Sequence, residues 1–174
     1  MDEVDIGLLI LRLTLGLLII GHGTQKAFGW FHGMGPTATA ELFDKWAFRP
    51  ARAMVYLAAA NECFGGLLMV LGMATPLATA MLVGTLSVAC VPSLPNGLWA
   101  TRGGYELALL YAAMAVVLGF TGSGRYSVDG VAGLPHPLWV GLAALVVGLL
   151  STLPILARRH SLLGRDAPAA ARSA

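Results

Sequence analysis

Long blocks of apolar residues, separated by short polar stretches, dominate the chain. The apolar positions show neither the stripe of an amphipathic helix nor the alternation of a strand. A bilayer-crossing helix needs about 20 such residues, so the pattern predicts five membrane-spanning helices. We place them at about Ile6–Lys26, Met54–Met73, Leu77–Leu94, Tyr105–Phe120 and Leu138–Ala157. The fourth, with about 16 residues, is the weakest span.

The breaks between the blocks contain residues that a helix interior avoids. Gly72–Pro76, Pro92–Gly97 and Gly122–Gly124 are rich in glycine, proline and serine, which is typical of turns. The first block follows an acidic start, Met1–Asp5, whereas a cleavable signal needs a positive one. We therefore expect the first span to be retained.

Composition supports a membrane protein. Of the 174 residues, 57% are hydrophobic and 11% are charged, whereas a soluble domain carries about a quarter charged residues. So few charges would not cover a water-facing surface. The expected fold class is an all-α, polytopic transmembrane helix bundle, with the lipid bilayer as its environment and no nucleic acid among its partners.

The distribution of basic residues predicts an orientation. With five spans, nine of the eleven Lys and Arg residues fall on the side that holds the first loop, the third loop and the C-terminal tail. Basic residues collect on the cytoplasmic side of membrane proteins. We therefore expect the N-terminus outside, the C-terminus in the cytoplasm, and a location in the cell (plasma) membrane.

The first loop contains a helix of its own, expected at residues 37–48. Leu42, Phe43 and Trp46 share one face of it, a pattern that favours a helix lying in the membrane interface. Two interpretations stay open. The helix is a lid or docking platform over the bundle, or, as we favour, a connector anchored by its aromatic side chains.

Polar and ionisable side chains inside the spans are the candidate functional residues, since they are costly in a bilayer and usually face a bundle interior or cavity. They are Arg12, His22, Gln25, Lys26, Glu62 and Glu106. From the helical rise, Glu62 lies near the membrane midplane, at a depth between those of Arg12 and His22. Because long basic side chains reach several ångströms along a helix, a contact between Arg12 and Glu62 is expected.

Four segments of the chain resemble the DoxX family of membrane proteins. They are Leu11–Gly29, Glu62–Gly66, Gly103–Glu106 and Gly122–Asp129, in the family's order. The resemblance spans about residues 6–130 and implies a four-helix membrane core over residues 1–130. Residues 131–157 would then add a fifth transmembrane helix, and residues 158–174 a basic, disordered cytoplasmic tail. The resemblance also includes Asp129, which we expect to be a turn or capping residue.

The resemblance implies an accessory or anchor subunit of a membrane redox complex, quinone-linked or associated with sulfur or oxidative-stress chemistry. No cofactor attached covalently or by a recognisable motif is expected, because no cysteine cluster, nucleotide fingerprint or zinc-ligand spacing occurs and only His22 among the histidines lies in a span. Quinone is the ligand to consider, and electrons would come from a soluble redox partner. Two alternatives stay open: a small transporter or channel, acting as a homo-oligomer, and a membrane scaffold whose charged pairs fix helix register.

Overall fold

The structure, a computed structural model, describes residues 3–172 as backbone and side chains up to Arg165. Over this range the chain is helical and contains no strand. The elements are α1 (Glu3–Phe28), α2 (Gly35–Lys45), α3 (Ala51–Leu71), α4 (Thr75–Cys90), the 3₁₀ turns η1 (Val91–Asn96) and η2 (Ala100–Arg102), α5 (Glu106–Thr121), α6 (Val128–Val131) and α7 (Leu138–Arg172). The predicted all-α bundle is confirmed.

Among the described residues, four helical stretches are long and apolar enough to cross a membrane: α1, α3, α4 with η1, and α7 as far as Arg165. The fifth apolar helix, α5, has 16 residues and would span about 24 Å. It was also the weakest of the predicted spans. Its ends agree with the predicted ones to within a residue, because the Gly103–Gly104 and Gly122–Gly124 turns flank it.

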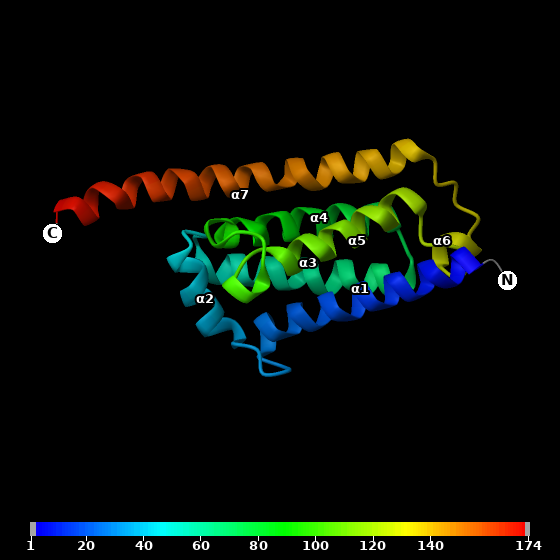
Figure 1. Cartoon of the computed structure of the whole chain (residues 1–174), viewed down its shortest axis with the longest axis horizontal. Helices are drawn as coiled ribbons and strands as arrows, with labels where there is room; N and C mark the ends of the chain where they lie inside the picture. Colours follow the sequence, from blue (N-terminus) through cyan, green and yellow to red (C-terminus); the bar gives the residue numbers. More distant parts are fainter. Residues whose placement is uncertain (1–2, 173–174) are drawn as a thin grey trace.

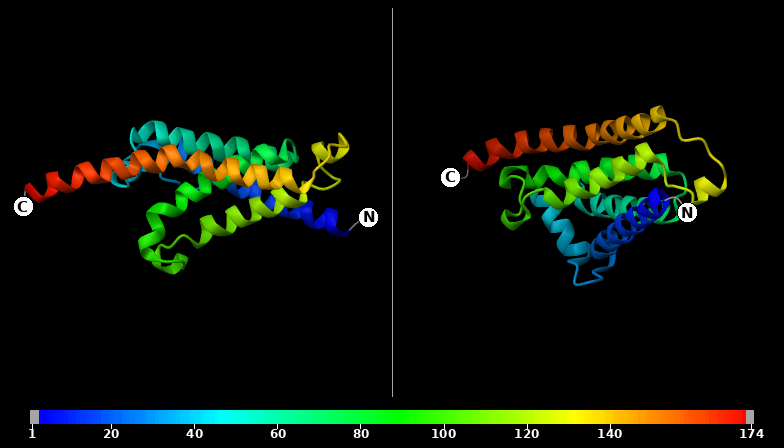
Figure 2. Two further views of the ribbon diagram at one scale, coloured as in Figure 1. Left: turned by 90° about the horizontal axis from the view of Figure 1, so that it is seen from above. Right: turned by 45° about the vertical axis from the view of Figure 1, so that its right-hand side comes forward.

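The helices α1, α3, α4 and α5 run alternately up and down, and α7 packs outside them against α4 and α5 (Figure 1). The two termini therefore lie at opposite ends of the bundle. The turned views in Figure 2 show α7 running beside the other helices over most of its length. The α2 helix and the η1–η2 loop lie at the same end of the molecule as the C-terminus. This is the arrangement that five alternating passes produce.

Glycines allow α1 and α3 to pack closely. A Cβ atom added to Gly16 would lie 2.6 Å from the carbonyl oxygen of Gly66, and one added to Gly23 would lie 2.6 Å from the sulfur of Cys63. Such close backbone approach is how transmembrane helices associate without a hydrophobic driving force between them. The contact fixes the register of the two helices, and with it the positions of the polar residues discussed below.

Asp129 holds the loop before α7 against the start of α4. Its carboxylate accepts hydrogen bonds from the backbone N–H of Ala74 and Thr75, at 2.8 and 2.9 Å, and from the Thr75 hydroxyl at 2.7 Å. These groups lie at the N-terminus of a helix, where backbone N–H groups have no partner within the helix. The expectation that Asp129 is a capping residue is confirmed.

Two ends differ from the sequence expectation. The first-loop helix is present, but it ends at Lys45, and Trp46–Phe48 form a turn after it. Where a disordered tail was expected from residue 158, α7 continues as a helix to Arg172. The residues just beyond the predicted span, Arg158–Leu163, contain no proline or glycine and include good helix formers, which extend a helix already begun in the bundle.

Candidate functional site

An ion pair joins the end of α1 to the middle of α3. The Lys26 ammonium lies 2.7 Å from Oε1 and 2.6 Å from Oε2 of Glu62. The Glu62 side chain is 4% exposed and that of Lys26 25%. Lys26 also donates a longer hydrogen bond, of 3.4 Å, to the backbone oxygen of His22 on its own helix. A nearly buried carboxylate thus has its charge balanced by one lysine.

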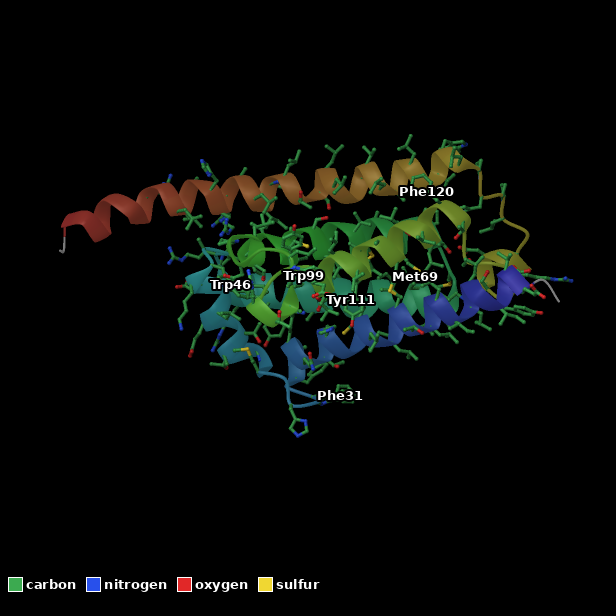
Figure 3. The ribbon with its side chains drawn as sticks, in the orientation of Figure 1. Phe31, Trp46, Met69, Trp99, Tyr111 and Phe120 are labelled. Carbon is green, nitrogen blue, oxygen red and sulfur yellow. The ribbon has the colours of Figure 1, made fainter. Side chains whose placement is uncertain are left out.

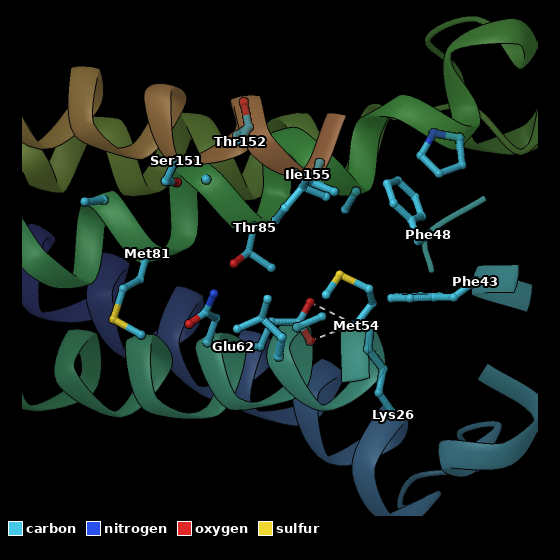
Figure 4. A pocket seen from close by; sticks show the side chains of 18 of the residues that line it. Lys26, Phe43, Phe48, Met54, Glu62, Met81, Thr85, Ser151, Thr152 and Ile155 are labelled. Atoms are coloured by element: carbon cyan, nitrogen blue, oxygen red, sulfur yellow. Dashed lines mark hydrogen bonds and ion pairs between the residues drawn. The ribbon is translucent and has the colours of Figure 1, made fainter. Parts of the chain in front are cut away.

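This ion pair lines a cavity of about 510 Å³, which we call the lateral cavity. The cavity lies between α3 and α7 over the surface of α4, and Figure 4 shows Lys26, Glu62 and Thr85 around it. Ligand pockets of this volume hold drug-sized molecules. Two of its lining residues, Leu57 and Leu77, are 44% and 52% exposed. The cavity is therefore open to the apolar surface of the bundle.

Aromatic side chains from α2 and the turn after it form one end of the lateral cavity. Phe43, Trp46 and Phe48 line it there, and Figure 3 shows Trp46 at the α2 end of the bundle. Phe43 packs against Trp46 and Phe48, with ring centroids 5.9 Å apart in both pairs. The first-loop helix thus supplies a wall of the cavity.

Helix α7 forms the wall opposite α3, because it packs closely against α4. A Cβ atom on Gly84 would lie 2.6 Å from the Ser151 hydroxyl oxygen, and one on Gly148 would lie 2.8 Å from the carbonyl oxygen of Ala80. Ser151 and Thr152 line the cavity and donate hydrogen bonds to carbonyl oxygens of their own helix. The fifth predicted span is therefore part of the site and not only an extension of the core.

Asn61 and Thr85 provide the other polar side chains of the lateral cavity. Among the described residues neither side chain makes a hydrogen bond, an ion pair or a ring contact, and both are half-buried. A bound molecule would therefore find an amide and a hydroxyl ready to donate, beside the Lys26–Glu62 pair. The rest of the lining is almost entirely apolar.

The predicted contact between Arg12 and Glu62 is wrong. Arg12 donates to the backbone oxygen of Val70 at 3.2 Å and to that of Tyr126, and its guanidinium tethers α1 to the loop before α6. The register that sets Gly16 against Gly66 separates Arg12 from Glu62 by eight residues of antiparallel helix, or about 12 Å. Lys26 occupies the position that reaches Glu62.

Three further candidates lie away from the lateral cavity. The His22 ring packs edge-on against Tyr111 of α5, with centroids 5.6 Å apart. The Gln25 amide donates to the backbone oxygen of Phe31 at 3.4 Å, in the loop after α1 that Figure 3 shows outside the helices. The Glu106 carboxylate accepts from the backbone N–H of Ala100 at 2.8 Å and closes the η2 loop. None of the three lines the cavity.

Of the six candidates, only Lys26 and Glu62 therefore meet at the cavity. Sequence reasoning missed the contributions of α2 and α7. The signal for α7 was its pair of hydroxyl residues, Ser151 and Thr152, in an otherwise apolar span. Within the described residues, no group of three or more His, Cys, Asp and Glu side chains lies close enough to hold a metal ion.

The chain was compared with known families, with curated proteins and with solved structures. Searches of curated proteins and of solved structures found no match. The DoxX family model matches residues 7–92, from the start of α1 to the first turn of η1, and so includes Lys26, Glu62 and the glycines between them. The sequence resemblance extended further, to about residue 130, and the boundaries of the core stay a prediction. With its DoxX domain and its long apolar helices, the chain is a DoxX-like integral membrane protein.

Proposed function

We propose that this DoxX-like protein binds an isoprenoid quinone in the lateral cavity and acts as an accessory or anchor subunit of a membrane redox complex. One observation carries the proposal: a single buried ion pair lies on the wall of an apolar cavity that opens on the lipid-facing surface of the bundle. A quinone is a lipid with an apolar tail, a flat ring and two carbonyl oxygens. It would enter from the bilayer and require few polar contacts.

The lining residues match these requirements. Asn61 and Thr85 have hydrogen-bond donors without partners among the described residues, and they would hold a carbonyl oxygen of the ring. Glu62 and Lys26, which are hydrogen-bonded to each other on the cavity wall, would exchange a proton with the ring. Quinone supplies two-electron, two-proton redox chemistry when bound. Leu57 and Met81 would contact its apolar part.

The electrons would come from a partner protein. We propose that this partner is a soluble redox protein and that it docks at the end of the bundle that carries α2 and the η1–η2 loop. By the distribution of basic residues, this end faces the cytoplasm and the N-terminus lies outside the plasma membrane. The lateral cavity is nearer to this end, because the α2 aromatics line it.

Trp46 provides a direct test because it lines the cavity, and quinones quench tryptophan fluorescence. The other three tryptophans, Trp30, Trp99 and Trp139, are 57%, 59% and 68% exposed and would be replaced by phenylalanine. Adding a short-chain quinone to the purified protein in mild detergent should then quench Trp46 in a saturable way.

Filling the cavity supplies the matched pair of variants. Ala58→Phe places a ring in the lateral cavity and should abolish saturable quenching. Ala113→Phe makes the same change at an exposed position of α5 and should leave it intact. Equal quenching in both variants, or a linear response in the parent protein, would refute quinone binding. The ion pair would then be left with a role in fixing helix register.

A further inference from the structure

A second cavity, of about 560 Å³, lies next to the lateral cavity, where the turn after α2 faces α7. We call it the basic pocket. Its charged lining residues are three arginines from two separate segments: Arg49, just before α3, and Arg158 and Arg159 on α7. No acidic side chain of the described residues lines it. Its remaining lining is Ala47, Phe48, Met54, Pro154, Ile155, Ala157 and Ser161.

Arg159 is held in place at the pocket. Its Nε donates a hydrogen bond of 2.9 Å to the backbone oxygen of Trp46, and its guanidinium lies over the Phe48 ring, 5.5 Å from the centroid. Among the described residues its two Nη groups make no hydrogen bond or ion pair. A planar guanidinium held in this way is suited to bind an anion through the N–H groups that are left.

The other two arginines add charge at the same place. Arg158 is exposed, and its side chain forms no ion pair or hydrogen bond within the described part of the chain. Arg49 is paired with Asp44, at 2.7 Å from its Nε, so the charges that a ligand would balance are those of Arg158 and Arg159. Asp44 does not line the pocket. The pocket therefore keeps a net positive charge that a ligand would balance.

The position of the pocket indicates which anion it takes. The apolar part of α7, from Leu138 to Ala157, is 20 residues and about 30 Å long, which is the thickness of a bilayer's hydrocarbon core. Arg158 therefore lies at the level of the lipid headgroups. Met54 and Ile155 line both this pocket and the lateral cavity, so the basic pocket continues into an apolar surface.

We infer that the basic pocket binds the phosphate of an anionic phospholipid, whose acyl chains lie over Met54 and Ile155. Basic pockets between transmembrane helices are a recurring way to hold such headgroups. The bound lipid covers the α2 end of the lateral cavity and fastens the first loop to α7. This inference does not rest on quinone binding, because the arginines do not line the lateral cavity.

The test uses the purified full-length protein in mild detergent and counts bound lipids by native mass spectrometry. Phosphatidylglycerol and phosphatidylcholine with the same acyl chains are added in turn, without quinone. The wild-type protein should retain one phosphatidylglycerol at a concentration where phosphatidylcholine is lost. Equal retention of the two lipids would overturn the inference.

Single charge removals then locate the lipid. Arg158→Gln should weaken phosphatidylglycerol binding about five-fold, the change that corresponds to about 1 kcal/mol for one basic residue near a headgroup. Arg165→Gln removes the same charge from α7 at an exposed position outside the pocket and should leave binding unchanged. Equal weakening in both variants would indicate diffuse charge attraction and overturn the site.

A third variant separates this inference from the proposed function. Ala58→Phe should leave phosphatidylglycerol binding within two-fold of the wild type, because Ala58 lines the lateral cavity and not the basic pocket. If quinone binding fails while phosphatidylglycerol binding persists, only the proposed function is lost. A loss of lipid binding in this variant would place the lipid in the lateral cavity and contradict the assignment.

Discussion

Removing Lys26 alone should destabilise the protein more than removing both Lys26 and Glu62. Lys26→Met leaves a carboxylate that is 4% exposed without its cation. Breaking a buried ion pair in this way costs about 3–5 kcal/mol. Lys26 is itself 25% exposed, so solvent already weakens the interaction. We therefore expect a loss of about 3 kcal/mol in the free energy of unfolding.

Glu62→Met and the double variant should lower the free energy of unfolding by less. Glu62→Met leaves the lysine near the end of α1, where its side chain can extend toward the headgroups, and we expect a loss of about 1 kcal/mol. The double variant removes both charges in favour of side chains of similar volume and should also lose about 1 kcal/mol. The single losses then exceed the double loss by about 3 kcal/mol, which is the coupling energy of the pair.

Reversible unfolding in mixed micelles of dodecyl maltoside and sodium dodecyl sulfate, followed by circular dichroism, measures these differences. Lys45→Met is the control, because Lys45 is an exposed lysine at the same end of the bundle, and it should change stability by less than 0.5 kcal/mol or so. Additive single losses would show that the two side chains do not interact in the folded protein and would refute this description of the site.

Three other predictions concern the packing and the loops. Gly16→Ala should lower the free energy of unfolding by about 1–3 kcal/mol, because its Cβ would lie 2.6 Å from a carbonyl oxygen of α3. Gly21→Ala is the control and should not lose stability, because no atom lies within 4 Å of the added Cβ. Equal effects of the two substitutions would refute the glycine contact. Asp129→Ala should lower the stability by about 1–2 kcal/mol in the same assay, since three hydrogen bonds at the start of α4 are lost; no change would exclude the cap. The hydrogen bond and charge of Arg49 hold the pKa of Asp44 below its usual value. The contact therefore stabilises the first loop fully at a pH above the pKa of an unfolded aspartate. This stabilisation is lost as the pH falls through the lowered pKa of Asp44. A carboxyl NMR titration of wild type and Arg49→Gln should show the pKa rising in the variant, and identical curves would contradict the contact.

The fold could be predicted largely from the sequence because the signals were local. Five apolar blocks and three groups of turn residues determine the number and order of the long helices. The turn composition around Asp129 was also a local signal, but the partners of its carboxylate, Ala74 and Thr75 at the start of α4, could not be predicted from it. Figure 1 shows the consequence, a bundle of alternating helices with the termini at opposite ends.

The site could be predicted only in part because it depends on helix register. Depth alone allowed either Arg12 or Lys26 to reach Glu62. The contacts of Gly16 and Gly23 with α3 fix the register of the two helices. This register places Arg12 about 12 Å from Glu62 along the helix axis. The Glu106 carboxylate, another candidate, bonds to its own loop instead.

The lateral cavity could not be predicted, because its walls come from segments far apart in the sequence. Trp46 follows α2, Glu62 lies on α3, and Ser151 lies on α7. No local pattern predicts that α7 packs on α4 and leaves a cavity between α7 and α3.

Quinone content per polypeptide tests the central claim most directly. The wild-type protein, Ala58→Phe and Ala113→Phe would be purified from the same native membranes in mild detergent, and their lipids extracted and quantified by mass spectrometry. The account predicts isoprenoid quinone close to one per chain in the wild type and in Ala113→Phe, and its loss from Ala58→Phe. Quinone at the same low level in all three proteins would contradict it.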